Sequence, residues 1–295
     1  MKEILTIFTP TYNRAYILSQ CYEALCKQTL KDFTWLVVDD GSTDNTKQLI
    51  EKWIIEKKIN IQYVYQENAG KQRAVNTAVR NCKTKFFAFL DSDDYYEKDT
   101  VKRFYDIFEK IYDNPKVAGV VARRGTPDKK IVGTPNLPKK EFIANMDVVV
   151  KKYKFFGDTC RAYKIDVLRN HLYPEISDKF IPETYMLSSI DFYFDLYFVN
   201  EIFSISEYLS DGYTKNAQEL YRNNPKGVAL AYNQLTIARQ GFVNMVKSII
   251  RYTVWCKKNK IIDSYKNCKN KVAYIIFYPL SYIFYVCKIP KWFFE

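Results

Sequence analysis

Short apolar runs and helix-like segments alternate along the first hundred residues. Each run is rich in β-branched and aromatic residues and ends in polar turn residues, which is typical of strands. The four runs cover residues 4–8, 35–38, 61–65 and 86–90. After the first run, apolar residues from Ile17 to Leu25 follow the i, i+4 spacing of a helix, and Asn13 is placed to cap it. This alternation predicts an α/β fold with a mixed, mostly parallel sheet flanked by helices.

The pattern changes twice further along the chain. Residues 115–140 are rich in Pro and Gly, which favours loops and short strands, and residues 141–221 are mixed. From about Pro225 the chain is helical, basic and apolar together. The expected divisions are one α/β domain over residues 1–224, with halves 1–114 and 115–224, and a helical extension over residues 225–295.

Charge and cysteine content narrow the function classes. The formal net charge of the 295 residues is +12, but the segment from Arg222 to Glu295 alone carries 13 basic and 2 acidic residues. The basicity therefore belongs to the tail, which argues against nucleic-acid binding by the α/β part. Seven scattered cysteines without a Cys-x-x-Cys pair, and a single histidine, make a zinc site or a disulfide scaffold improbable. The N-terminus shows no signal-peptide pattern, so we expect a cytoplasmic protein.

The fourth apolar run ends in a group of carboxylates, in the stretch "FFAFLDSDDYY". Asp91 and Asp93 would lie at the end of a rigid strand, where hard oxygen ligands suit Mg²⁺ or Mn²⁺ and leave positions open for a diphosphate. Like charges this close repel, so we expect a cationic partner for at least one of them. The alternative is an acidic turn that caps the next helix, a role that fits Asp94 or Asp99.

Polar clusters follow the other three runs as well. Asp39 and Asp40 end the second run, and a carboxylate there can accept hydrogen bonds from a nucleobase or a ribose, although a plain turn explains it too. In "TPTYNR", Tyr12 offers a face for base stacking and Arg14 a fork for phosphate, while the alternative is a buried tyrosine beside a surface arginine. The Gly-x-Gly-x-x-Gly fingerprint is missing, which counts against a nicotinamide or flavin cofactor.

The segment after the third run, "ENAGKQRAVN", brings cations to the same predicted edge of the sheet. Asn68, Lys71 and Arg73 follow that strand around a glycine. A diphosphate held between a metal ion and these basic side chains would relieve the repulsion between Asp91 and Asp93.

Four motifs in this order and spacing, "TPTYNR", "VVDDGSTDNT", "QENAGKQRAVN" and "FLDSDD", resemble the family 2 glycosyltransferases of the GT-A fold. The resemblance is strong over the first 115 residues and looser to about residue 225. It is greatest to members that build bacterial capsule, teichoic-acid and exopolysaccharide glycans. It implies that residues 1–114 are the nucleotide-binding half and residues 115–224 the acceptor half of a catalytic domain.

The resemblance also implies roles for individual residues. A UDP-sugar donor would be held at its uridine by Pro10, Tyr12 and Asp40. Near the uridine or the diphosphate would lie Arg14, Asn68, Lys71 and Arg73. Asp91 and Ser92 would contact the donor, and Asp91 and Asp93 would hold Mn²⁺ or Mg²⁺.

Such enzymes invert the anomeric centre and need a general base beyond the metal motif. The resemblance places Glu183, in "FIPETY", at that position, although relatives often show Glu-Asp where this chain has Glu-Thr. Asp191 is the second candidate for the base. Asp158 is a candidate for binding a sugar hydroxyl, and Thr214 or Arg222 for reaching the diphosphate.

The basic C-terminal segment suggests that the protein associates with a membrane surface. Residues 272–287 are uncharged and aromatic, but a membrane-spanning helix needs roughly 20 residues, so we expect this segment to lie in the headgroup region of the inner face of the cell membrane. Lysines around it favour an anionic leaflet. The alternative is an aromatic face for homo-oligomerisation or for packing on the catalytic domain.

The preferred interpretation is an inverting, metal-dependent glycosyltransferase that moves a sugar from UDP to a hydroxyl of a glycan acceptor carried on a polyprenyl diphosphate. One alternative enzyme is a polyprenyl-phosphate glycosyltransferase. A non-enzymatic alternative is a peripheral membrane or nucleic-acid binding module that uses the basic tail.

Overall fold

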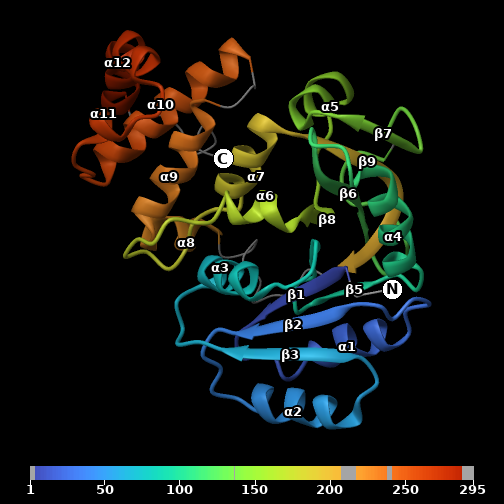
Figure 1. Cartoon of the computed structure of the whole chain (residues 1–295). Helices are drawn as coiled ribbons and strands as arrows, with labels where there is room; N and C mark the ends of the chain where they lie inside the picture. Colours follow the sequence, from blue (N-terminus) through green and yellow to red (C-terminus); the bar gives the residue numbers. More distant parts are fainter. Residues whose placement is uncertain (1–3, 136, 207–216, 238–240, 288–295) are drawn as a thin grey trace. The chain divides into compact units, whose positions relative to one another are not determined.

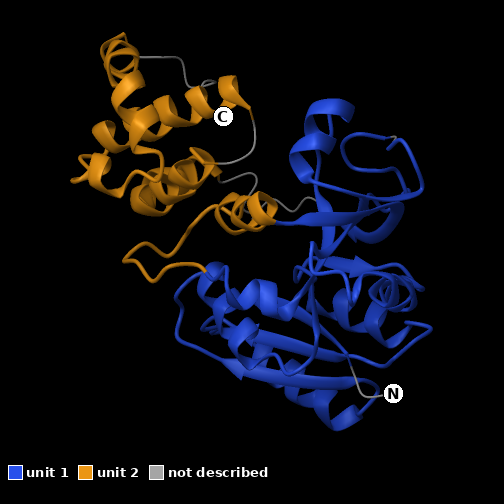
Figure 2. Ribbon diagram, turned by 45° about the horizontal axis from the view of Figure 1, so that its top comes forward, with its two compact units in different colours: residues 1–172, 194–210 blue, residues 173–193, 211–295 orange. Residues whose placement is uncertain are grey.

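The computed structural model describes residues 4–135, 137–206, 217–237 and 241–287 (Figure 1). The chain forms two compact units (Figure 2). Unit 1 contains Met1–Leu172 and Phe194–Ser210, and unit 2 contains Tyr173–Tyr193 and Asp211–Glu295. The sequence predicts a catalytic domain that ends at residue 224 and an extension that begins at residue 225. This division concerns function and stays a prediction.

Unit 1 is built on one nine-stranded sheet with the order β3-β2-β1-β4-β8-β6-β9-β5, and β7 pairs with β9. The strands are β1 (Leu5–Thr11), β2 (Thr34–Asp39), β3 (Asn60–Tyr65), β4 (Phe86–Phe89), β5 (Asp94–Tyr96), β6 (Val117–Gly125), β7 (Glu141–Ala144), β8 (Thr159–Lys164) and β9 (Asp195–Ser206). The four strands predicted in the first hundred residues are confirmed.

The sheet is mixed, as predicted, and its two halves differ. Strands β1 to β4 pair only in parallel with one another. Beyond β4, the strand β8 runs antiparallel between β4 and β6, while β6 and β9 are parallel. The carboxyl ends of β1, β2, β4 and β6 therefore lie at one edge, together with the amino ends of β5 and β8.

Helices cover the sheet of unit 1 (Figure 1). They are α1 (Leu18–Cys26), α2 (Thr46–Glu56), α3 (Lys71–Asn81), α4 (Thr100–Ile111), α5 (Met146–Tyr153) and α6 (Ile165–Arg169). The buried core joins α1, α2 and α4 to one face of the sheet, with Phe86 stacked on Phe108 at 3.7 Å between ring centroids. The predicted helix cap at Asn13 is wrong: α1 begins at Leu18 after Ile17, and the Asn13 side chain bonds elsewhere.

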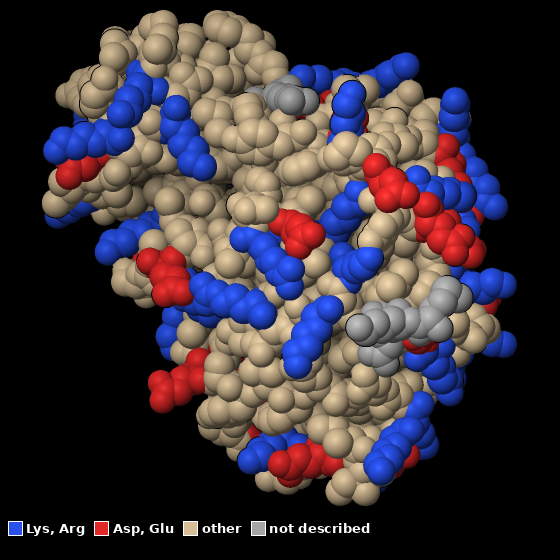
Figure 3. All heavy atoms as spheres, viewed as in Figure 1, with Lys and Arg blue, Asp and Glu red and all other residues tan. Residues whose placement is uncertain are grey.

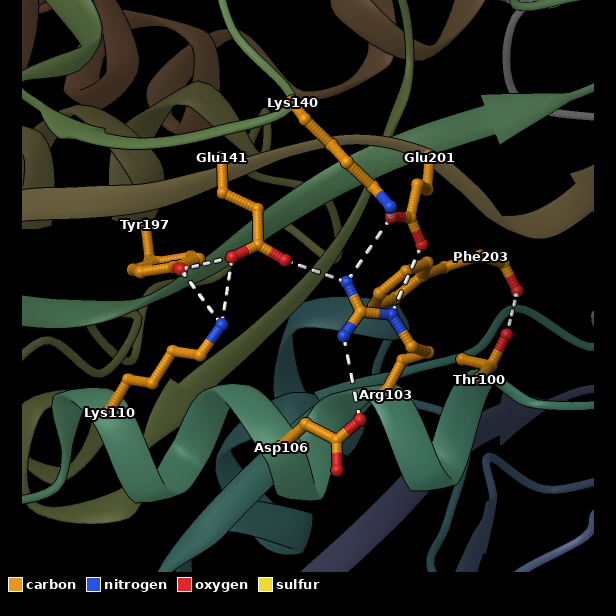
Figure 4. Close-up of polar contacts among 9 residues, drawn as sticks. All are labelled: Thr100, Arg103, Asp106, Lys110, Lys140, Glu141, Tyr197, Glu201 and Phe203. Atoms are coloured by element: carbon orange, nitrogen blue, oxygen red, sulfur yellow. Dashed lines mark hydrogen bonds and ion pairs between the residues drawn. The ribbon is translucent and has the colours of Figure 1, made fainter.

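An ion-pair cluster ties α4 to β7 and β9 (Figure 4). Arg103 lies at its centre and contacts Glu141 at 2.7 Å and Glu201 at 3.1 Å. The Glu141 carboxylate also accepts hydrogen bonds from Lys110 at 2.8 Å and from the Tyr197 hydroxyl at 2.6 Å. Hydrogen bonds from Lys110, Tyr197 and Arg103 lower the pKa of Glu141 to about 2. We name this set of side chains the Arg103 cluster.

The described part of unit 2 is helical. Its helices are α7 (Thr184–Tyr193), α8 (Ala217–Asn223), α9 (Pro225–Leu235), α10 (Phe242–Lys258), α11 (Ser264–Asn267) and α12 (Lys271–Val286). A small core of its own joins α9, α10 and α12 through residues such as Val228, Ile249 and Tyr274. The predicted helical character of the extension is confirmed. Among the described residues, no helix is both long and apolar enough to cross a bilayer.

Candidate active site

Charged and polar side chains gather at the edge of the sheet where β1, β2, β4 and β6 end. In open α/β sheets this is the edge at which ligands bind, because the loops after the parallel strands converge there. The sequence-predicted residues of unit 1 at this edge lie on the strand ends, on the loops after β1 to β4, or in the first turn of α3: Pro10, Tyr12, Arg14, Asp40, Asn68, Lys71, Arg73, Asp91, Ser92 and Asp93.

The loop after β1 is joined to the loop after β2. The Asn13 side-chain oxygen accepts hydrogen bonds from the backbone N–H groups of Thr43 at 2.7 Å and Asp44 at 3.3 Å, and Asn13 has the positive φ of 53° that this turn requires. In return, the backbone N–H of Ala15 donates to Asp44 at 3.0 Å. These bonds fix the backbone directly after Tyr12, which is about half exposed, so part of its ring is open to stacking.

Asp40 is buried and organises the loop after β3. Its carboxylate accepts hydrogen bonds from the backbone N–H groups of Ala69 at 2.9 Å and Gly70 at 2.8 Å, and from the side chain of Gln66 at 2.7 Å. The side-chain amide of Asn68 donates a hydrogen bond to the backbone carbonyl of Asp40 at 3.0 Å. Asp40 thus holds residues 66–70 in place, and α3 begins directly after them with Lys71.

Two cationic side chains lie beside the Asp91 carboxylate and offset its repulsion from the neighbouring carboxylates. Lys71 Nζ lies 2.8 Å from Asp91 Oδ1, and Arg124 Nη2 lies 3.8 Å from Asp91 Oδ2. Burial raises the pKa of the Asp91 carboxyl, but Lys71 and Arg124 outweigh it and hold that pKa below its usual value. The predicted cationic partner is therefore confirmed, and Arg124 is a second one.

Asp93 stands in a different environment. Burial, and then the charge of Asp91, raise the pKa of the Asp93 carboxyl, while Arg14 and Lys71 act in the opposite direction. The carboxylate is thus kept close to Asp91 against repulsion, and a divalent cation between the two would remove that cost. Ser92, between them, is 8% exposed.

A metal ion would find two carboxylates here. Among the described residues no group of three or more Asp, Glu, His or Cys side chains is arranged to hold a metal. Two protein ligands fit the way Mg²⁺ binds with phosphates, since the remaining positions go to water and to diphosphate oxygens. The side chains present therefore fit a metal that arrives together with a diphosphate.

Asp94 does not act as a helix cap. Its side chain is 4% exposed and its carboxylate Oδ2 lies 2.8 Å from Arg124 Nη2. Burial raises the pKa of the Asp94 carboxyl to about 7, with Arg124 acting against that shift. The other alternative, Asp99, precedes α4 and accepts a hydrogen bond from the Thr29 hydroxyl at 2.8 Å without capping its own helix.

The remaining predicted residues are spread over both units. Asp158 is exposed and directly precedes β8, at the same edge as Asp91, in unit 1. Glu183 is exposed immediately before α7, and Asp191 follows two turns later on that helix, both in unit 2. Arg222 is exposed on α8. Thr214 lies outside the described residues.

Arg124 is a residue of this edge that the sequence interpretation missed. Burial lowers the pKa of its guanidinium, but the carboxylates of Asp94, Asp91 and Asp158 outweigh burial and raise that pKa. The signal was present in "VAGVVARRG", where an apolar run ends in two arginines. The surrounding prolines and glycines gave no strand register, so nothing in the sequence placed this run beside Asp91.

The fold and this edge define an α/β protein whose charged side chains converge where ligands bind in such sheets. The model of the family described as "Glycosyl transferase family 2" matches residues 6–172, which is more than half of the chain. The chain belongs to this family, and the predicted resemblance is confirmed. Family membership argues against the alternative of a non-enzymatic binding module.

Two curated relatives show how far the similarity extends. A chondroitin synthase of Escherichia coli is 35% identical over 107 residues, which are 36% of this chain and 16% of that protein. A putative teichuronic acid biosynthesis glycosyltransferase of Bacillus subtilis, TuaG, is 28% identical over 137 residues, or 45% of this chain and 54% of that one. The chain thus spans only a part of these relatives.

Solved structures confirm the GT-A fold. TarS of S. aureus, residues 1–349 in complex with UDP-GlcNAc, has a TM-score of 0.59 at 16% identity, over 99% of this chain and 83% of that one. The mannosyltransferase PcManGT of Pyrobaculum calidifontis, in complex with GDP-Man and Mn²⁺, has a TM-score of 0.53 at 16% identity, over 98% and 89%. At this identity the likeness concerns the fold alone.

Proposed function

We propose that the protein is an inverting, metal-dependent glycosyltransferase that moves a sugar from a UDP-sugar to a hydroxyl of a glycan acceptor in bacterial surface polysaccharide synthesis. The observation that carries the proposal is the group formed by Asp91, Asp93 and Lys71 at the carboxyl ends of the parallel strands. Support for the donor and the polymer comes from the UDP-GlcNAc complex of TarS and from the names of the two relatives.

Asp91 and Asp93 would hold Mn²⁺ or Mg²⁺ against the donor diphosphate. When bound, such an ion neutralises the charge that develops on the leaving diphosphate. Lys71 and Arg14 would add positive charge on the protein side of the same group, and the exposed ring of Tyr12 would stack on the uracil. The Mn²⁺ complex of PcManGT supports a metal in this fold.

Binding can be tested with a panel of nucleotide sugars, each with Mn²⁺ or Mg²⁺, read by thermal shift and by release of UDP. We expect a rise in melting temperature with UDP-sugars that depends on the metal, and no comparable rise with guanosine nucleotides. A chain that responds to no uridine nucleotide would contradict the proposal.

Glu183 is the proposed general base, and the acceptor decides whether one is needed. A hydroxyl must lose its proton as it attacks, whereas the phosphate of the alternative polyprenyl-phosphate acceptor is already ionised. We expect Glu183→Gln to lower the rate with a glycan acceptor by about 100-fold or more, the usual size of a general-base contribution. Asp191→Asn serves as the control, and a Glu183→Gln enzyme with wild-type kcat would favour the phosphate acceptor only if Asp191→Asn, which removes the second candidate base, also keeps wild-type kcat.

We further propose that α12 docks on the anionic inner face of the cell membrane, where a polyprenyl-diphosphate-linked acceptor would be presented. Five apolar residues of this helix are between 56 and 69% exposed: Val272, Ile275, Ile276, Ile283 and Val286. The surface over α12 is largely uncharged, with basic side chains beside it (Figure 3). An exposed apolar helix face with a basic surround fits an anionic bilayer surface.

Sedimentation of the full chain with phosphatidylglycerol vesicles tests this placement. The variant with both Ile276→Glu and Ile283→Glu should lose most binding, because two charges would enter the headgroup region with the helix. Ile55→Glu is the matched control, since Ile55 is 78% exposed on α2 of unit 1. If the double variant still sediments like the wild type, α12 is not the docking face.

A further inference from the structure

Arg123 and Arg124 are adjacent in sequence, yet their side chains lie in different surroundings. The register of β6 against β9 shifts at this point, from Val121 beside Phe198 to Arg124 beside Ser204. Irregularities of this kind turn side chains away from the regular alternation of a strand. Arg123 packs on the Phe155 ring at 5.0 Å, whereas Arg124 reaches the carboxylates of Asp91 and Asp94.

The contact between Arg124 and Asp94 spans three strands. Asp94 opens β5 and is paired with Ser206 of β9, while Arg124 on β6 is paired with Ser204 of the same strand. The guanidinium therefore crosses β9 to reach Asp94 at 2.8 Å. Only 4% of the Asp94 side chain and 18% of the Arg124 side chain are exposed, so loss of Arg124 would leave the Asp94 carboxylate buried without its ion-pair partner.

Asp94 also closes the turn that carries the two proposed metal ligands. Its backbone N–H donates to the Asp91 carbonyl at 3.0 Å, so residues 91–94 form one hydrogen-bonded turn. The side chain at the far end of this turn is held by Arg124, and the same guanidinium lies 3.8 Å from Asp91 at its start. One arginine thus contacts both ends of the turn.

We propose that Arg124 is a positioning residue that fixes the turn from Asp91 to Asp94, so that Asp91 and Asp93 face a divalent cation and the diphosphate it accompanies. The proposal rests on the proposed function. Both contacts are made by Nη2, so the role depends on the positive charge at this one position between the two carboxylates.

Isothermal titration of the full chain with Mn²⁺ in the presence of UDP tests this role without turnover. We expect Arg124→Gln to weaken Mn²⁺ binding by about 10- to 100-fold, the range seen when a partner that orients a metal ligand is lost. Arg124→Lys should lose less, because it keeps the charge. Arg103→Gln is the matched control: it removes an arginine held between carboxylates of the same unit and should leave Mn²⁺ affinity unchanged.

Circular dichroism establishes that each variant is folded before titration. A folded Arg124→Gln protein with wild-type Mn²⁺ affinity overturns the positioning role. Where Arg124→Gln does not fold, Arg124→Lys and Asp94→Asn decide the question, and wild-type affinity in both overturns the role equally. A wild-type chain that binds neither Mn²⁺ nor UDP overturns the proposed function itself, which distinguishes that failure from this one.

Discussion

Two arginines of unit 1 are each held between carboxylates. Arg103 on α4 contacts Glu141 and Glu201, and Arg124 on β6 contacts Asp91 and Asp94. Their side chains are exposed to similar degrees, 24% and 18%. Their locations differ, because the Arg103 cluster joins α4 to β7 and β9, whereas Arg124 lies at the strand ends among the proposed donor-binding residues.

The difference between the two clusters lies in the balance of charge. In the Arg103 cluster, Lys110 and Lys140 add to the arginine, so Glu141 and Glu201 each have two cationic partners. Asp106 lies 3.5 Å from Arg103 as a third carboxylate, so three cations face three carboxylates. At the sheet edge, Asp91, Asp93 and Asp94 belong to one turn, and burial, followed by the charge of Asp91, raises the pKa of the Asp93 carboxyl. A satisfied cluster contributes stability, while an incompletely neutralised one has capacity left for a cation.

The strongest test of this contrast is Asp93→Asn. We expect the transfer rate to fall by about 100-fold or more, because a metal ligand worth several kcal/mol in the transition state is lost. The melting temperature should stay the same or rise, since one of two mutually repelling carboxylates is gone. Initial rates and thermal unfolding measured on the same preparation check both. A variant with normal activity would remove Asp93 from the proposed site.

Arg103→Met should show the opposite profile. We expect the free energy of unfolding to fall by about 1–2 kcal/mol, between the values for exposed and buried ion pairs, because Glu141 and Glu201 are each left with a lysine partner. Activity per folded molecule should not change. Urea unfolding and kcat measurements test this pair of expectations, and a loss of kcat without a loss of stability would contradict it.

The smallest expected effect is on how the free energy of unfolding changes at acid pH. The pKa of Glu141 is lowered from 4.5 to about 2, so its contribution to stability is complete above pH 4.5 and is lost as the pH falls toward 2. The wild-type protein should therefore lose more stability than Glu141→Gln between pH 4.5 and pH 2. Urea unfolding at several pH values measures this, and parallel curves for the two proteins would show that Glu141 is not involved.

Much of the first half of the fold followed from the sequence, because its strands are local apolar runs with clear ends. Strands β1 to β4 were predicted correctly from the pattern. The second half resisted prediction because its pairings join distant segments: β5 and β6 are both paired with β9, more than 70 residues further along the chain. Arg124 was missed for that reason, and so was the burial of Asp94 beside it.

Asn13 shows the opposite kind of error. An asparagine before a helical segment is a good cap on local grounds, but its side chain instead bonds the backbone of Thr43 and Asp44. The tertiary contact replaces the local one, and it joins two loops that the sequence treats as separate.

The bonds of Asp40 bear on how enzymes of this kind diversify. Because both of its oxygens are committed to residues 66–70, that loop cannot gain or lose a residue without breaking several hydrogen bonds at once. Insertions there would be selected against, and substitution of Asp40 would displace Lys71 together with the loop. Engineering of donor preference is therefore better directed at the side chain of Tyr12, which is about half exposed.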